Sequence, residues 1–160
     1  MDESKAFTPA QRAGLDERLA DQDRTLAAIH QLEAALGDAA PRREQQWRER
    51  VVTALAALDE ATAQEYQNGE EPDSLLSDIK RTQPRLRTRV RGLRTHYRQI
   101  RDAIAAIGHE LHQPAEPADF ADLRQRLAWV LASLQHQRAR ESDLIYEAYY
   151  EAFNVDLGDG

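Results

Sequence analysis

Apolar residues recur every three or four positions along four long segments of the chain, a spacing typical of amphipathic α-helices. We expect these helices at about residues 9–36, 41–69, 84–112 and 120–153. Their predicted inward faces carry Leu15, Leu19, Leu26, Ile29, Leu32 and Leu36; Trp47, Val51, Leu55 and Leu58; Leu86, Val90, Leu93, Tyr97, Ile100, Ile104, Ile107 and Leu111; and Phe120, Leu123, Leu127, Val130, Leu134, Leu144, Ile145 and Ala148. Four such faces bury one another when the helices pack side by side.

The prolines fall at or between the ends of these segments, where they punctuate helices rather than interrupt them. Residues 8–11 read as a capping box, Pro41 and Asp119 begin the second and fourth helices, and Pro84 begins the third after a short helix at residues 75–79. The sequence therefore predicts an all-α chain: an antiparallel, up-down four-helix bundle with a short extra helix between the second and third long helices. We expect a flexible N-terminus at 1–8, the bundle at 9–153, and a flexible acidic tail at 154–160.

Composition narrows the classes of partner and cofactor. The 160 residues are enough for one domain, and the absence of cysteine excludes disulfides, thiolate zinc sites and iron–sulfur clusters. A net charge of −7 disfavours nucleic acid as a partner, because the long-range field repels polyanions. Apolar runs are too short to span a membrane, and the start lacks a signal-like apolar core. We therefore expect a cytoplasmic protein without a membrane partner, either a monomer or a homodimer.

Carboxylates interrupt two of the apolar faces. At 100° per residue, Glu141 falls at the same angle as Leu123, and Glu65 at the same angle as Trp47. A buried carboxylate needs a cation, a histidine or a metal ion beside it. The helical rise places Glu60, Glu65, His96, His136 and Glu141 within about 11 Å of one another along the bundle axis. These five residues are the candidate metal ligands.

The same segments resemble the hemerythrin-like, or HHE cation-binding, family of four-helix bundles. The resemblance lies in the acidic link and short leucine-rich helix at residues 69–79, the Pro84 start, Leu93 to His96, and the pattern from Leu134 through His136 to Glu141. In that family, about five histidines and two carboxylates hold two irons that bind or sense dioxygen. The resemblance implies that His96, His136 and Glu141 are ligands.

The other ligand positions of that family depart from its pattern. The second helix has Glu60 and Gln64 where the family has a histidine and a glutamate, and the first helix offers Gln22, Asp23 and Thr25 where a histidine is expected. The resemblance therefore implies a depleted site: a small metal-binding or sensing domain, holding one iron or another divalent metal, and not an enzyme.

A metal-free alternative stays open, in which the chain is a structural or protein-interaction bundle. The same polar residues would then hydrogen-bond to one another or pair with Arg140 or Arg89, and would set the register of the bundle. Catalysis by the carboxylates is not expected, because the sequence supplies no glycine-rich walls for an open cleft.

Two surface patterns bear on partners. Five arginines recur at helical spacing opposite the apolar face of the third helix, and we expect them to be solvated and to pair with acids of a neighbouring helix; binding of phosphate or nucleic acid is the alternative. They are Arg87, Arg91, Arg94, Arg98 and Arg101. Near the C-terminus, Tyr146, Tyr149 and Tyr150 would pack at the end of the bundle or mark a surface for an unknown protein partner.

Overall fold

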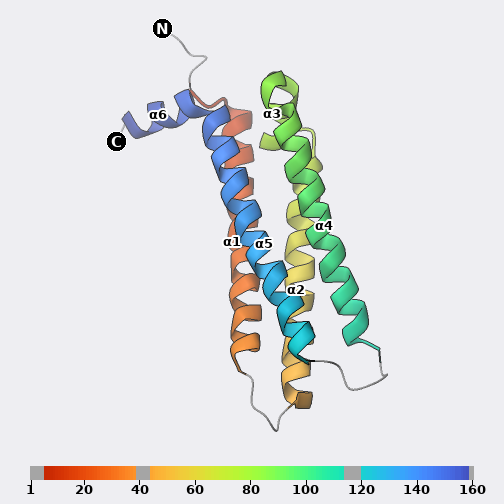
Figure 1. Ribbon diagram of the computed structural model, residues 1–160. Coiled ribbons are helices and arrows are strands. Elements are labelled where there is room, and N and C mark those ends of the chain that lie inside the picture. Colours follow the sequence, from red (N-terminus) through yellow and green to blue (C-terminus); the bar gives the residue numbers. More distant parts are fainter. Residues whose placement is uncertain (1–5, 39–43, 114–119, 159–160) are drawn as a thin grey trace.

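The computed structural model describes residues 6–38, 44–113 and 120–158. Four long helices, α1 (Pro9–Gly37), α2 (Glu44–Glu70), α4 (Arg87–Leu111) and α5 (Phe120–Ala148), lie alongside one another (Figure 1). The short helix α3 (Leu75–Thr82) and a 3₁₀ turn, η2 (Pro84–Leu86), connect α2 to α4, and α6 (Tyr150–Gly158) follows α5. Within these residues there is no strand, so the prediction of an all-α chain is confirmed.

The long helices alternate in direction along the chain (Figure 1). α1 packs against α2, α2 against α4, and α4 against α5, while α3 contacts both α1 and α4 at one end of the molecule. In the three described ranges, no helix is both long enough and apolar enough to cross a membrane.

The helix ends follow the predicted capping chemistry where the structure describes them. Thr8 Oγ1 accepts a hydrogen bond from the Gln11 backbone, and Gln11 Oε1 accepts one from the Thr8 backbone, so the capping box is confirmed. Ser74 caps α3 by accepting from the Ser77 backbone at 3.1 Å. The predicted starts at Pro41 and Asp119 lie outside the described residues.

Three of the four predicted faces are confirmed by burial. All twelve predicted positions of α2 and of the η2–α4 segment are buried, and so are most of those on α5. α1 is the exception. Leu19 is 50% exposed, and the inward face of α1 instead carries Asp21, Gln22 and Thr25 before it becomes apolar at Ala28.

The C-terminal segment is helical beyond residue 154, where a flexible acidic tail was expected. α6 continues to Gly158, and residues 159–160 lie outside the described ranges. Contacts with the N-terminal residues hold α6 in place: Phe153 packs edge-on against Phe7, with ring centroids 5.0 Å apart, and Asp156 pairs with Arg12 at 2.6 Å. Phe7 and Thr8 are therefore engaged in the fold, and residues 1–5 are not described.

The buried apolar residues form two separate clusters. The large core fills the end of the molecule nearest the α1–α2 and α4–α5 links, and the small core lies beneath α3 and α6. The large core comprises Ala28, Ile29, Leu32, Ala35, Trp47, Val51, Ala54, Leu55, Leu58, Ile100, Ile104, Ile107, Leu111, Leu123, Leu127, Val130, Leu131 and Leu134. The small core comprises Leu75, Leu76, Ile79, Leu86, Val90, Leu93, Leu144, Ile145, Tyr149 and Ala152.

Candidate functional site

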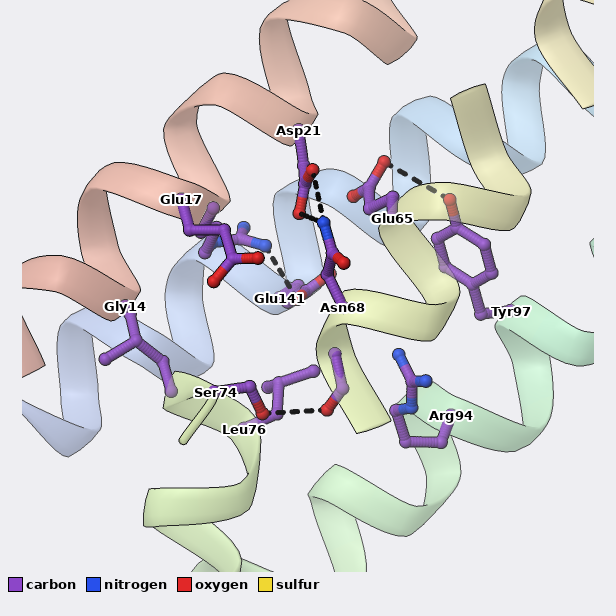
Figure 2. A pocket seen from close by; sticks show the side chains of 13 residues that line it. Gly14, Glu17, Asp21, Glu65, Asn68, Ser74, Leu76, Arg94, Tyr97 and Glu141 are labelled. Carbon is purple, nitrogen blue, oxygen red and sulfur yellow. Dashed lines mark hydrogen bonds and ion pairs between the residues drawn. The ribbon is translucent and has the colours of Figure 1, made fainter. Parts of the chain in front are cut away.

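Polar side chains occupy the level between the two cores, on all four long helices. On α5 they lie between Leu134 and Leu144, and on α4 between Leu93 and Ile100. We call this set the polar layer; it comprises Arg18, Asp21, Thr25, Glu65, Asn68, His96, Tyr97, Gln137 and Glu141. Figure 2 shows Asp21, Glu65, Asn68, Tyr97 and Glu141 directed toward one volume.

Three of the five predicted metal ligands lie in this layer and two do not. Glu141 is buried, while Glu65 and His96 are half-buried. Glu60 and His136 are exposed to solvent. The predicted convergence on one interior site is therefore corrected for these two residues. The inward face of α5 runs through Leu134, Gln137 and Glu141, and His136 is turned away by the 100° that separates it from Gln137.

The inward position that the sequence interpretation assigned to His136 is taken by Gln137. Its Oε1 lies 2.8 Å from His96 Nδ1, and its Nε2 donates to the Leu93 carbonyl at 2.8 Å. Because the amide oxygen can only accept, this network places a proton on His96 Nδ1. The amide thereby fixes the imidazole and joins α5 to α4.

Glu141 has a cation as its partner. Arg18 Nη1 lies 2.6 Å from Glu141 Oε1, so the cation comes from α1, and the expected pairing with Arg140 or Arg89 is corrected. Arg140 is exposed, and Arg89 pairs with Glu147. Burial raises the pKa of the Glu141 carboxyl above its ordinary value; Arg18 opposes this rise, and the nearby Glu65 adds to it.

Glu65 is held by two hydroxyl groups. Thr25 Oγ1 donates to Glu65 Oε2 at 2.6 Å, and the Tyr97 hydroxyl donates to the same atom at 3.2 Å. Burial, reinforced by the Glu65 and Glu141 carboxylates, raises the pKa of Tyr97 above its ordinary value. Tyr97 therefore stays a hydrogen-bond donor throughout the physiological pH range.

Asp21 of α1 completes the layer on the α2 side. Asn68 Nδ2 donates to both carboxylate oxygens of Asp21, at 2.9 and 3.1 Å. Arg24, on the next turn of α1, also pairs with Asp21. The layer thus joins α1 to α2 through Asp21, and α1 to α5 through Arg18. Each of its carboxylates has a donor within the chain.

The free space in the layer is small. A cavity of about 30 Å³ lies beside Arg18, Asp21 and Arg94, and a second of about 20 Å³ lies beside Thr25 and Gln137. Each has room for about one water molecule and is far below the 300 Å³ or more of a typical small-molecule site. The layer can therefore compensate charge inside the protein, but it has no room for an organic substrate.

These residues do not fit a resident metal ion. Across the described part of the chain, no group of three or more His, Asp or Glu side chains is arranged to hold one. The reason lies in the donors themselves: His96 Nδ1 is bonded to Gln137, Glu141 to Arg18, and Glu65 to two hydroxyls. A cation entering here would meet the Arg18 guanidinium as well as the carboxylates.

The sequence interpretation missed Arg18, Asp21 and Gln137 as members of the layer. A signal was present, because residues 18, 21 and 25 share the spacing that continues into Ala28 and Leu32. The leucines at 15, 19 and 26 indicated a different face of the same helix.

Two of the five arginines in the α4 strip pair with acids of a neighbouring helix, as expected for the whole strip. Arg94 pairs with Glu70 at 2.8 Å and Arg101 pairs with Asp59, so the strip joins α4 to acids of α2. Arg98 donates to the Tyr66 hydroxyl instead.

The C-terminal tyrosines divide between packing and exposure. Tyr149 is buried in the small core and donates to Asp78 Oδ2 at 2.6 Å. Tyr146 and Tyr150 are exposed and contact each other edge-on.

In comparisons with known proteins, no family model, no curated protein and no solved structure matched this chain.

Proposed function

We propose that the chain is an antiparallel, up-down four-helix bundle that serves as a protein-interaction module and needs no metal ion. The observation that carries this proposal is an apolar stripe across the bend between α5 and α6. Tyr146, Tyr150 and Leu157 are 46%, 54% and 76% exposed, and Phe153 stacks on Tyr146 with ring centroids 5.6 Å apart. We call these four residues the elbow stripe.

The elbow stripe rests on a well-anchored base. Tyr149 turns inward at the bend and is bonded to Asp78, while Phe7 packs against both Tyr149 and Phe153. The Arg12–Asp156 pair ties α6 to α1. Because the base is packed, the stripe is already organised for contact, and ordering it on binding costs little entropy.

Charge around the stripe defines the chemistry of the partner. Asp143 and Glu151 are exposed acids close to it in the sequence, whereas Glu147 between them is paired with Arg85 and Arg89. A second copy of this chain would bring like charges together across a symmetric contact, which disfavours self-association. The partner that fits is a different protein with an apolar contact surface and a basic rim, such as an amphipathic helix carrying lysine or arginine.

In this proposal the polar layer supports the interaction surface indirectly. Buried polar pairs that must meet across helices penalise any shift of one helix along another, since a shift would leave a charge unpaired. The register of α1 against α5 sets where Arg12 and Phe7 meet α6. The layer therefore fixes the geometry of the elbow stripe.

The test uses two helical peptides of equal length, one of leucine and lysine and one of leucine and glutamate, and measures binding by fluorescence anisotropy. We expect the basic peptide to bind, and Tyr146→Ser/Tyr150→Ser to weaken it by about tenfold or more, since exposed aromatic anchors dominate such contacts. Trp129→Ser is the matched control, because Trp129 is 49% exposed on α5 away from the bend.

Equal loss in the Trp129 control, or equal binding of the acidic peptide, would contradict the proposal. Sedimentation of the protein alone tests the remaining possibility, which is that the elbow stripe binds a second copy of this chain. If the wild type dimerises and Tyr146→Ser/Tyr150→Ser is monomeric, the stripe binds a second copy and a different partner is not required.

A further inference from the structure

A groove beside α3 is lined by several positively charged side chains, although the net charge of the protein is −7. It has a volume of about 310 Å³ and is lined by residues at the end of α2, in α3, and on α4. Lys80, Arg91, Arg94 and Arg98 line it, and Glu70 is the one acid among the described residues that do so.

Tyr66 holds two of these arginines in place. The Arg94 guanidinium lies over the Tyr66 ring, 4.1 Å from its centroid, and donates to the Tyr66 carbonyl at 2.6 Å. Arg98 donates through Nε and Nη2 to the Tyr66 hydroxyl, both at 3.2 Å. Both guanidinium groups are thus oriented before any ligand arrives, which lowers the entropy cost of binding an anion.

Gly69 supplies the space that Arg94 occupies. A Cβ atom at this position would lie 2.6 Å from Arg94 Nη1 and 3.2 Å from its Cζ. A residue with a side chain would therefore displace the guanidinium from the groove. The Arg94 hydrogen bond lowers the pKa of Glu70, which agrees with a groove of net positive charge.

The other two cations are free to bind. Within the described ranges, neither the Lys80 ammonium nor the Arg91 guanidinium has a hydrogen-bond or ion-pair partner. Elsewhere in this region Arg85 and Arg89 share one acid, Glu147, and Arg101 pairs with Asp59.

Among the described residues that line the groove, Arg94 is paired with Glu70, whereas Lys80, Arg91 and Arg98 have no acid within ion-pair distance. Arg91 to Arg98 covers about 10 Å along the helix, at 1.5 Å per residue. That length suits one compact, multiply charged anion rather than an extended polyanion such as nucleic acid, which needs a row of free cations and meets a repulsive net charge. Paired guanidinium planes match the oxygens of a phosphoryl group.

We propose that this groove binds the phosphoryl group of a phosphate monoester, with Arg94 and Arg98 presenting fixed donors and Lys80 and Arg91 supplying free charge. The ligand is a small phosphorylated molecule or a phosphoserine side chain, since both offer the same group. The proposal concerns a different surface from the elbow stripe and does not depend on it.

Isothermal titration calorimetry on the full chain tests the proposal with three probes: inorganic phosphate, a phosphoserine peptide, and the same peptide unphosphorylated. We expect the phosphorylated probe to bind, the unphosphorylated peptide not to bind, and affinity to fall with added salt. Binding of phosphate alone indicates a small ligand, and much tighter binding of the phosphopeptide indicates a protein source.

The decisive variant is Lys80→Gln/Arg91→Gln, which removes two exposed cations whose side chains make no hydrogen bond or ion pair within the described ranges, so we expect it to fold. We expect affinity to fall by about tenfold or more, since each charge-assisted hydrogen bond contributes that much. Arg140→Gln, an exposed arginine on α5, is the matched control and keeps wild-type affinity.

Tyr66→Phe tests the positioning role separately, because it removes the hydroxyl that holds Arg98 but keeps the ring beneath Arg94. It should weaken phosphate binding less than the double variant and leave the salt dependence unchanged. Absence of binding by phosphate and by the phosphopeptide, equal loss in Arg140→Gln, or an affinity indifferent to salt would overturn the proposal.

Discussion

Arg18 on α1 and Glu141 on α5 form an ion pair inside the protein, with their side chains 12% and 9% exposed. At this exposure solvent screens the pair weakly, so each charge depends on the other for compensation. The pair lies between the two apolar cores and joins the first long helix to the last.

Removing the cation of this pair should be costly. We expect Arg18→Met to lose about 3 to 5 kcal/mol in the free energy of unfolding, because it leaves Glu141 buried without a partner. Arg18→Met/Glu141→Met should regain most of that loss, since no isolated charge remains. Urea denaturation measures both. A loss below about 1 kcal/mol in the single variant would mean that the pair behaves like a surface pair.

The pH dependence of stability should change in Glu141→Gln. Burial raises the pKa of folded Glu141 above its ordinary value of 4.5, so the folded state binds this proton more tightly than the unfolded state does. The stability that this tighter proton binding gives the folded state is fully present below pH 4.5 and is lost as the pH rises through the folded pKa of Glu141. In Glu141→Gln this part of the decline should disappear from urea titrations made at a series of pH values. Glu60→Gln, at an exposed position of α2, is the control, and an unchanged slope in Glu141→Gln would contradict the prediction.

Two buried tyrosines should limit stability in alkali. Burial raises the pKa of Tyr97 and of Tyr149, and each hydroxyl also donates to a carboxylate, Glu65 or Asp78. The unfolded chain releases these protons near pH 10, so stability falls as the pH rises above that value.

Tyr97→Phe/Tyr149→Phe should lower stability at neutral pH by about 1 to 3 kcal/mol per hydroxyl removed, and should flatten the alkaline decline. Near-ultraviolet absorbance of tyrosinate, followed beside the unfolding transition, checks this result. If the wild type ionises these tyrosines while still folded, the prediction is wrong.

Leu19 and Leu32 lie on the same predicted stripe of α1 but have opposite environments. Leu32 is fully buried in the large core and Leu19 is half-exposed. Leu32→Ala should therefore cost about 2 to 5 kcal/mol by leaving a cavity. Leu19→Ala should stay within about 0.5 kcal/mol of the wild type. Thermal and urea denaturation of the two variants distinguish this arrangement from one in which both leucines pack inward.

The helices were predictable because their signals are local. Pro84, the Thr8 capping box and the apolar spacing from Leu86 to Leu111 each act within one or two helical turns, and each is confirmed. The extent of α6 was not predictable in this way. Its acidic and glycine-containing end indicates a flexible tail, but α6 is helical to Gly158, and Phe7 and Arg12, more than 140 residues away in the sequence, contact it.

The candidate site was predicted in part. The angle of Glu141 on α5 correctly indicated a buried carboxylate in need of a partner. Its partner, Arg18, lies on another helix, and no spacing within α5 points to it. His136 and Gln137 are adjacent, so a shift of one residue in the assumed inward face exchanges an imidazole for an amide.

The sequence by itself determined that this chain is helical, where most of its helices begin and end, and which faces of α2, α4 and α5 are apolar. Periodicity and capping act over a few residues and need no knowledge of neighbours. Only the tertiary structure decided that Arg18 neutralises Glu141, that Gln137 rather than His136 meets His96, and that Tyr66 orients Arg94 and Arg98. These outcomes depend on how helices are rotated and staggered against each other, and a difference of one residue turns a side chain from the interior to the solvent.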